Sequence, residues 1–207
     1  MTVKVVLVRH GHIEGIHPER FRGRAEIPLS SLGEKQRLLT AKRIKAGWEP
    51  AIVFTSSLGR CIATGQAIAD ECKVGHEVLP ELYDIDYGSW QWKTHEEIRQ
   101  SDPKAFECWK KFPDQMQMPE GESLQQVLSR VTQALSKTLK NHEGKTVVMV
   151  AHDSVNRVML LHMLGLPLSK YWAIKQDPCC INEIDFNEGV FQINSINETW
   201  HLHEIDG

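Results

Sequence analysis

The feature that most constrains the fold is a run of aliphatic, mostly β-branched residues that ends directly in polar ones. Val3 to Val8 read V-K-V-V-L-V, and Arg9, His10 and Gly11 follow without a spacer. Such a run is typical of a strand buried on both faces of a sheet. Ligands of open α/β sheets bind at the carboxyl ends of the strands, so a ligand site is expected here. The competing interpretation is a strand end that simply carries polar residues out of the core.

Two later segments repeat this arrangement. Residues 51–55 and 146–151 are short apolar runs, and Arg60 and His152 follow them closely. A helical segment follows each run. Strands that alternate with helices predict a mostly parallel sheet with right-handed crossovers. Because parallel strands end at the same edge of a sheet, we expect the polar residues after all three strands to meet.

The remaining segments complete the prediction of a three-layer α/β/α fold. The predicted elements are a helix over about 32–46 capped by Ser30 or Ser31, a helix through about Asp70, a strand over 77–79, one or two helices over 94–112 broken near Asp102-Pro103, a long helix from Ser123 to about Asn141, a helix over about 154–164, and a C-terminal β-hairpin of 181–186 and 190–196. A helical insertion between strand–helix units, at about 94–122, predicts a lid. The length of 207 residues is consistent with a single domain over 1–207.

Composition excludes several classes of partner. The formal charge of −3 and the pI near 6.4 provide no general attraction to nucleic acid or to anionic membranes. No apolar run approaches the ~20 residues of a membrane span. The five cysteines are odd in number and scattered, which favours free thiols in the cytoplasm over a disulfide framework. The oligomeric state stays open, with a homodimer among the options.

The residue types at the three strand ends favour phosphate as the ligand. Guanidinium groups match phosphate oxygens in bidentate geometry, and helix starts after Ser56 and Asp153 would add backbone N–H donors. A neutral imidazole in such a pocket can attack phosphorus. A carboxylic acid must then protonate the leaving oxygen, and the acidic loop from Asp84 to Asp86 is where we expect it.

The sequence resembles the histidine phosphatase superfamily, the phosphoglycerate-mutase-like group. The segments that carry the resemblance are R-H-G (9–11), R-F-R-G-R-A-E-I-P-L-S-S-L-G (20–33), S-S-L-G-R-C-I-A-T (56–64), L-Y-D-I-D-Y-G-S-W (82–90), P-E-G-E-S-L (119–124), V-A-H-D-S-V-N-R (150–157) and N-E-T-W-H-L (197–202). They occur in the family's order and cover nearly the whole chain. Size and the closing motif are similar to those of the compact phosphatase branch, which includes α-ribazole phosphatases.

The resemblance implies a function and a set of site residues. It implies a phosphomonoesterase that acts on a small phosphorylated metabolite and releases inorganic phosphate, with no metal or other cofactor. The implied residues are His10 as the phosphorylated nucleophile, Arg9, Arg60 and His152 as phosphate ligands, Asp84 as the acid, and Arg22, Gly23 and Asp153 beside the substrate. Glu81 and Asp86 are the alternatives for the acid.

Three positions depart from the family pattern. Asp84 stands where the family commonly has glutamate, Ile16 where it often has asparagine, and Asp153-Ser154 where two small residues are usual. These departures keep a non-catalytic phosphate-binding module among the alternatives. A phosphoglycerate-type mutase is the alternative within the fold.

A metal-dependent hydrolase is the remaining alternative. His10, His12, His17 and His152 would be its candidate ligands. Arginines beside the first histidine would repel a cation, and no acidic residue lies at a ligand-like spacing, so this alternative ranks below the phosphatase.

Overall fold

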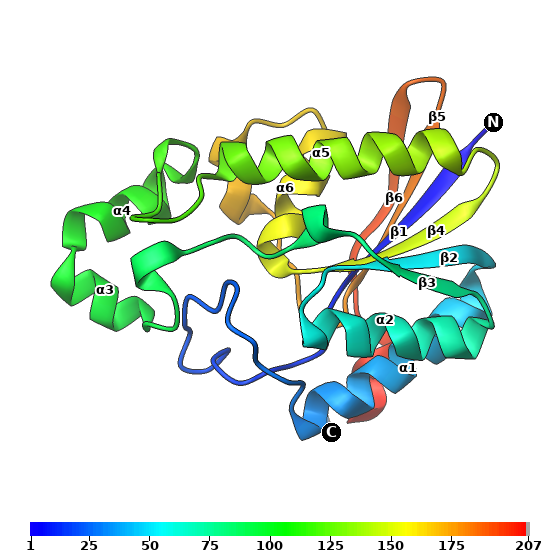
Figure 1. Cartoon of the computed structure of the whole chain (residues 1–207), viewed down its shortest axis with the longest axis horizontal. Coiled ribbons are helices and arrows are strands. Elements are labelled where there is room, and N and C mark those ends of the chain that lie inside the picture. The colour runs from blue at the N-terminus through cyan, green and yellow to red at the C-terminus, as the bar shows by residue number, and fades with distance from the viewer. Residues whose placement is uncertain (206–207) are drawn as a thin grey trace.

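The computed structural model describes residues 1–205, and these form a six-stranded sheet with helices on both faces (Figure 1). The strand order is β3-β2-β4-β1-β5-β6. The strands are β1 (Val3–Arg9), β2 (Pro50–Thr55), β3 (Gly75–Val78), β4 (Thr146–Ala151), β5 (Ile181–Asn187) and β6 (Val190–Glu198). The helices are α1 (Ser31–Gly47), α2 (Gly59–Cys72), α3 (His95–Ser101), α4 (Pro103–Lys111), α5 (Leu124–Asn141) and α6 (Asp153–Met163). The predicted α/β/α fold is confirmed.

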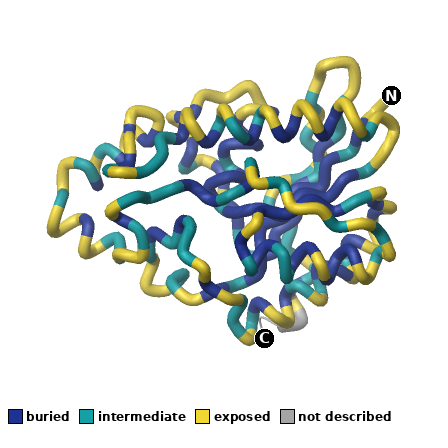
Figure 2. Tube along the Cα trace, viewed as in Figure 1, coloured by how far each residue is buried: buried dark blue, intermediate teal, exposed yellow. Residues whose placement is uncertain are grey.

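The alternation of side chains along the central strands builds two cores. On β1, Val5 and Leu7 belong to the core beneath α5 and α6, whereas Val6 and Val8 belong to the core beneath α1 and α2. All four residues are buried, as expected of a strand covered on both faces. The buried trace in Figure 2 runs through the middle of the sheet, between the two helical layers.

The hairpin of β5 and β6 extends the sheet beyond β1. β1 pairs in parallel with β4 on one side and antiparallel with β5 on the other. The alternation of parallel strands and helices is therefore followed by two antiparallel strands, β5 and β6. Because β5 pairs with β1, β1 is an interior strand of the sheet. The predicted mostly parallel sheet and the C-terminal hairpin are both confirmed.

The insertion over 94–122 forms α3 and α4, which project to one side of the sheet (Figure 1). Asp102 ends α3 and also caps α4, accepting a hydrogen bond from Ala105 N–H at 3.1 Å. Pro103 at the first position of α4 fits this break, because proline lacks the N–H that would continue α3. Trp109 of α4 is buried in the core under α5 and α6, so the insertion packs as an extension of that core.

Among the described residues, no helix combines the length and the apolar character needed to cross a membrane.

Candidate active site

Three strand ends bring the predicted polar residues together. Arg9 is the last residue of β1 and pairs in register with Ala151, the residue before His152. Arg60 lies in the first turn of α2, which follows β2. The imidazole centroids of His10 and His152 are 5.2 Å apart in an edge-to-face arrangement. The prediction that these side chains meet at one edge of the sheet is therefore confirmed.

The hydrogen bonds of His10 define which ring nitrogen is free. Nδ1 lies 2.7 Å from the carbonyl oxygen of Gly11, which can only accept, so Nδ1 carries the proton. Nε2 is then the lone-pair nitrogen, and it accepts from Arg60 Nε at 3.3 Å. Burial lowers the pKa of His10 well below its usual value, and the charges of Arg60 and Arg9 lower it further. The imidazole is neutral, with Nε2 facing the arginine.

Arg60 is fully buried and its guanidinium is held on several sides. Nη1 donates to Ala25 O and Nη2 to Gly23 O, each at 2.7 Å. Nη2 also lies 3.4 Å from the carboxylate oxygen Oδ2 of Asp84. Since the carbonyl acceptors fix the plane of the group, Arg60 presents its charge to His10 and Asp84 at the same time.

Asp84 is the acidic residue that reaches His152 and Arg60. Its Oδ2 lies 3.6 Å from His152 Nδ1, and the side chain is almost fully buried. Burial raises the pKa of Asp84, and the charge of Arg60 opposes that rise. Asp86, the alternative, instead pairs with Arg24 at 3.2 Å and accepts from Gly88 N–H at 2.8 Å. The geometry therefore places Asp84, and not Asp86, beside the His152 imidazole.

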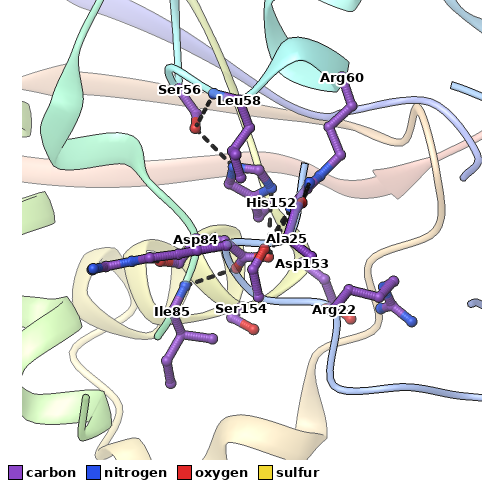
Figure 3. A network of polar contacts seen from close by, with 12 residues as sticks. Arg22, Ala25, Ser56, Leu58, Arg60, Asp84, Ile85, His152, Asp153 and Ser154 are labelled. Carbon is purple, nitrogen blue, oxygen red and sulfur yellow. Dashed lines mark hydrogen bonds and ion pairs between the residues drawn. The ribbon is translucent and has the colours of Figure 1, made fainter. Parts of the chain in front are cut away.

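His152 is oriented by Ser56, the first residue after β2 (Figure 3). Its Nε2 lies 2.8 Å from Ser56 Oγ. The same hydroxyl accepts weakly from Leu58 N–H at 3.4 Å. Burial also lowers the pKa of His152 well below its usual value, with Arg60 as the next cause. His152 is therefore a second neutral imidazole, held in one orientation by a hydroxyl.

Arg9 reaches the site with part of its guanidinium unpaired. Its Nη1 donates to the carbonyl oxygen of Gln176 and lies 4.0 Å from Asp153 Oδ2. Its Nε is buried and has no hydrogen-bond partner among the described residues. A buried N–H is costly unless it is paired, so this donor fits an anionic ligand.

A family model described as histidine phosphatase superfamily, branch 1, matches residues 5–199. The chain belongs to this superfamily. The predicted resemblance is confirmed over nearly the whole chain.

Named relatives and a solved structure are similar to this chain over nearly all of their length. Phosphoserine phosphatase 1 of Hydrogenobacter thermophilus is 33% identical over 98% of this chain and 96% of its own. The adenosylcobalamin/α-ribazole phosphatase of Escherichia coli is 22% identical over 94% and 96%. The structure of Bacillus stearothermophilus YhfR superposes with a TM-score of 0.91 at 27% identity, covering 97% of this chain and all of that one. The similarity to the compact phosphatase branch is thus confirmed.

The residues predicted to border the substrate occupy different places in this histidine phosphatase. Arg22 donates to Gly15 O at 2.9 Å, which directs it toward the loop after β1. Gly23 has a left-handed φ of +44° and supplies a carbonyl to Arg60; a Cβ there would lie 2.9 Å from Ile85 O. Asp153 begins α6 and pairs with Arg157 at 2.6 Å. Their proposed contacts with substrate stay predictions.

The backbone donors expected after Ser56 belong to α2, which begins at Gly59 with Leu58 in an extended conformation as its N-cap. The Gly59 N–H already donates to Glu26 Oε1 at 2.8 Å. One N–H of the first turn of α2 is therefore already paired, and α6 begins immediately after His152.

Sequence reasoning did not identify Gln176 or the Ser56 hydroxyl as groups that orient site residues. Gln176 lies outside the strand-end motifs, and the contact of Ser56 is with His152, 96 residues away in the chain. Within residues 1–205, no group of three or more histidine, cysteine or acidic side chains is arranged to hold a metal ion.

Proposed function

We propose that this protein is a phosphomonoesterase that hydrolyses a small phosphorylated metabolite through a phosphohistidine on His10. The observation that carries the proposal is the arrangement around Nε2 of His10. That nitrogen is unprotonated, lies 3.3 Å from Arg60 Nε, and shares Arg60 with the Asp84 carboxylate. The buried guanidinium of Arg60 thus contacts both the nucleophile and the acid, and it is itself the cation of the site.

The first chemical step transfers the phosphoryl group to the enzyme. The lone pair of His10 Nε2 attacks phosphorus, and the bond between phosphorus and the ester oxygen breaks. Protonated Asp84 gives its proton to the leaving oxygen, which departs as an alcohol. Arg9, Arg60 and His152 stabilise the charge on the equatorial oxygens, and the Nδ1–H bond to Gly11 O supports the imidazolium that forms.

The second step returns the enzyme to its starting state. The Asp84 carboxylate takes a proton from water, whose oxygen attacks the phosphorus of phospho-His10. The P–N bond breaks, inorganic phosphate leaves, and the electron pair returns to Nε2. Both steps balance with water as the only co-reactant, so the side chains present are sufficient for the chemistry.

The relatives support small phosphorylated metabolites as the substrate class. Phosphoserine and α-ribazole 5′-phosphate are the first candidates, from the names of the two relatives described above. The five cysteines are free in the structure, which supports a cytoplasmic location. The mutase alternative uses the same phosphoenzyme but returns the phosphoryl group to the substrate.

Phosphate release from phosphoserine, α-ribazole 5′-phosphate, 3-phosphoglycerate and p-nitrophenyl phosphate, with and without EDTA, tests the proposal. We expect EDTA-resistant release that vanadate inhibits. His10→Ala should abolish it, and acid-quenched wild-type enzyme should hold an acid-labile, base-stable phosphoryl group.

Two results would contradict the proposal. Isomerisation of 3-phosphoglycerate that outpaces phosphate release would favour the mutase. Undiminished release by His10→Ala would remove the phosphohistidine from the mechanism.

A further inference from the structure

A buried network of side-chain amides lies behind Arg9. Its members are Gln176 in the segment before β5, Asn182 in β5 and Asn156 in α6, and each is at most 2% exposed. Within residues 1–205, none of these three amide side chains is hydrogen-bonded to His10, Arg60 or Asp84. Buried amides are costly unless they are paired, and here Gln176 and Asn182 pair with each other while Asn156 donates to Gln176.

Gln176 and Asn182 form a reciprocal amide pair. Gln176 Nε2 donates to Asn182 Oδ1 at 2.7 Å, and Asn182 Nδ2 donates back to Gln176 Oε1 at 3.0 Å. Asn156 Nδ2 adds a third donor to Gln176 Oε1 at 3.2 Å. The pair thereby fixes the Gln176 side chain relative to both β5 and α6.

The hydrogen-bonding capacity of Asn182 is used completely. Its second Nδ2 hydrogen donates to Leu7 O at 2.9 Å, two residues before Arg9 on β1. Its Oδ1 also accepts from Asn197 N–H at 2.9 Å. An amide carries two donors and two acceptor lone pairs, and all four are engaged here. The position therefore requires an asparagine oriented in one way, and an apolar side chain of similar size could not replace these contacts.

The network ends on the guanidinium of Arg9. The backbone carbonyl of Gln176 accepts from Arg9 Nη1, so the position of that carbonyl sets the position of Nη1. The chain then reverses at Cys179, which has a left-handed φ of +57°, and Cys180 O accepts the backbone N–H of Arg9 at 3.2 Å. With one end of the guanidinium held, the buried Nε has no partner among residues 1–205.

We propose that Gln176 and Asn182 are positioning residues that orient Arg9 so that its Nε and remaining N–H groups face the substrate phosphate. The inference rests on the proposed function, because it assigns the oriented guanidinium to phosphate binding. Hydrogen bonds between charged groups depend steeply on angle, so a small rotation of Arg9 weakens its contribution.

A double-mutant cycle on vanadate affinity tests this role. Asn182→Leu should weaken vanadate binding and lower kcat/KM by about ten-fold. This loss is smaller than that expected from removing a whole hydrogen bond to a charged group. In the Arg9→Ala background, the same substitution should change vanadate affinity by less than about two-fold, because the group it orients is gone. Gln176→Met is a second variant with the same expectation.

Asn194→Leu is the matched control, because it removes an exposed amide from the neighbouring strand β6. It should leave vanadate affinity unchanged in both backgrounds. Thermal unfolding of each variant identifies any that does not fold. If Asn182→Leu does not fold, the cycle is completed with Gln176→Met.

The resonance of Arg9 Nε–H gives a readout that needs no turnover. Its loss in Arg9→Ala identifies it in a ¹⁵N–¹H spectrum, and we expect it to shift in Asn182→Leu and Gln176→Met but not in Asn194→Leu.

The positioning role and the proposed function would be contradicted by different results. Equal losses from Asn182→Leu in the wild-type and Arg9→Ala backgrounds, or an unmoved Nε–H resonance, would overturn the positioning role. A wild-type protein that neither hydrolyses phosphate esters nor binds vanadate would overturn the proposed function, while the Nε–H resonance would still report whether the amide pair orients Arg9.

Discussion

At the scale of residues, burial and one guanidinium together act on the protonation of His10 and Asp84. His10 must be neutral to attack, and Asp84 must be protonated to donate. Burial favours the uncharged form of both groups, lowering the pKa of His10 and raising that of Asp84. Arg60 supports the neutral state of His10 but opposes that of Asp84. The working state of the site is therefore the one that the low-dielectric environment favours.

Asp84→Asn should separate substrates by their leaving groups. An alcohol with a high pKa needs the proton that Asp84 supplies, so its turnover should fall by roughly 10²–10⁴-fold. p-Nitrophenyl phosphate needs little protonation and should lose much less. Steady-state kinetics on phosphoserine and p-nitrophenyl phosphate measure the difference, and Asp86→Asn is the control. Equal losses on both substrates would mean that Asp84 supports the pocket without donating a proton.

The pH dependence of kcat should follow the same group. Asp84 is active when protonated, so kcat on a poor leaving group should decline as the pH rises through its raised pKa. The decline should vanish in Asp84→Asn. A decline of the same position and size in that variant would assign it to another group.

Arg60→Ala should lower kcat/KM by about ten- to a hundred-fold, since hydrogen bonds to charged groups contribute roughly 1.5–3 kcal/mol. The substitution also leaves Asp84 buried without its cation, so binding of vanadate should weaken. Arg37→Ala is the control, because Arg37 pairs with the exposed Glu34 on α1 at 2.6 Å. Kinetics equal to those of the control variant would remove Arg60 from the site.

The residues that sequence reasoning could reach are those in strand-end motifs. Arg9, His10 and His152 follow apolar runs directly, and parallel strands bring such positions together whatever the loops do. Gln176 could not be predicted from the sequence, because its position depends on a chain reversal at Cys179 that no sequence pattern indicates.

At the scale of elements, α2 and β2 approach so closely that only glycine fits between them. A Cβ at Gly65 would lie 2.2 Å from Cγ2 of Thr55, a buried β-branched side chain with little freedom to move. The same helix carries Arg60 in its first turn. The packing of one glycine therefore bears on the placement of Arg60.

Gly65→Ala should reduce both stability and activity. Overpacking of this kind costs about 1–3 kcal/mol of unfolding free energy, and displacement of α2 should also lower kcat/KM. Gly75→Ala, at the start of β3, is the control because no atom lies within 4 Å of its added Cβ. Denaturant unfolding and steady-state kinetics compare the two. A Gly65→Ala protein as stable as the control would mean that the helix adjusts freely.

The elements themselves were largely predictable, and their order in the sheet was less so. Capping residues such as Ser30, Asp102 and Ser123 announce helix starts because their side chains bond to backbone N–H groups. The hairpin is visible as two alternating runs, but periodicity does not say which edge of the sheet it joins.

At the scale of the whole molecule, histidines that are buried or half-buried make stability depend on pH. Burial lowers the pKa of His201 to about 4, and it lowers those of His10 and His152 in the same direction. In the unfolded chain, histidines take up protons near pH 6.5. The unfolded state therefore binds more protons than the folded state below that pH, and acid favours unfolding.

The free energy of unfolding should fall as the pH is lowered from about 6.5 to 4. Urea unfolding at several pH values measures this slope, which His201→Gln should reduce. His201 Nε2 contacts Thr40 Oγ1 at 3.0 Å, and glutamine retains a polar group there. His203→Gln, which changes an exposed histidine nearby, is the control and should leave the slope unaltered. A slope that is flat in the wild type would contradict the assignment.

The antiparallel pairing of β1 with β5 has a consequence for biosynthesis. Val8 pairs with Ile181, so the strand that carries the nucleophile acquires its second neighbour only after 173 further residues have been translated. At ~5–20 residues per second, this delay is on the order of ten to thirty seconds. During that interval β1 is an exposed, strongly apolar strand with an unpaired edge, which is a template for aggregation. We therefore expect a chain that lacks β5 and β6 to be more prone to aggregation than the chain that contains them.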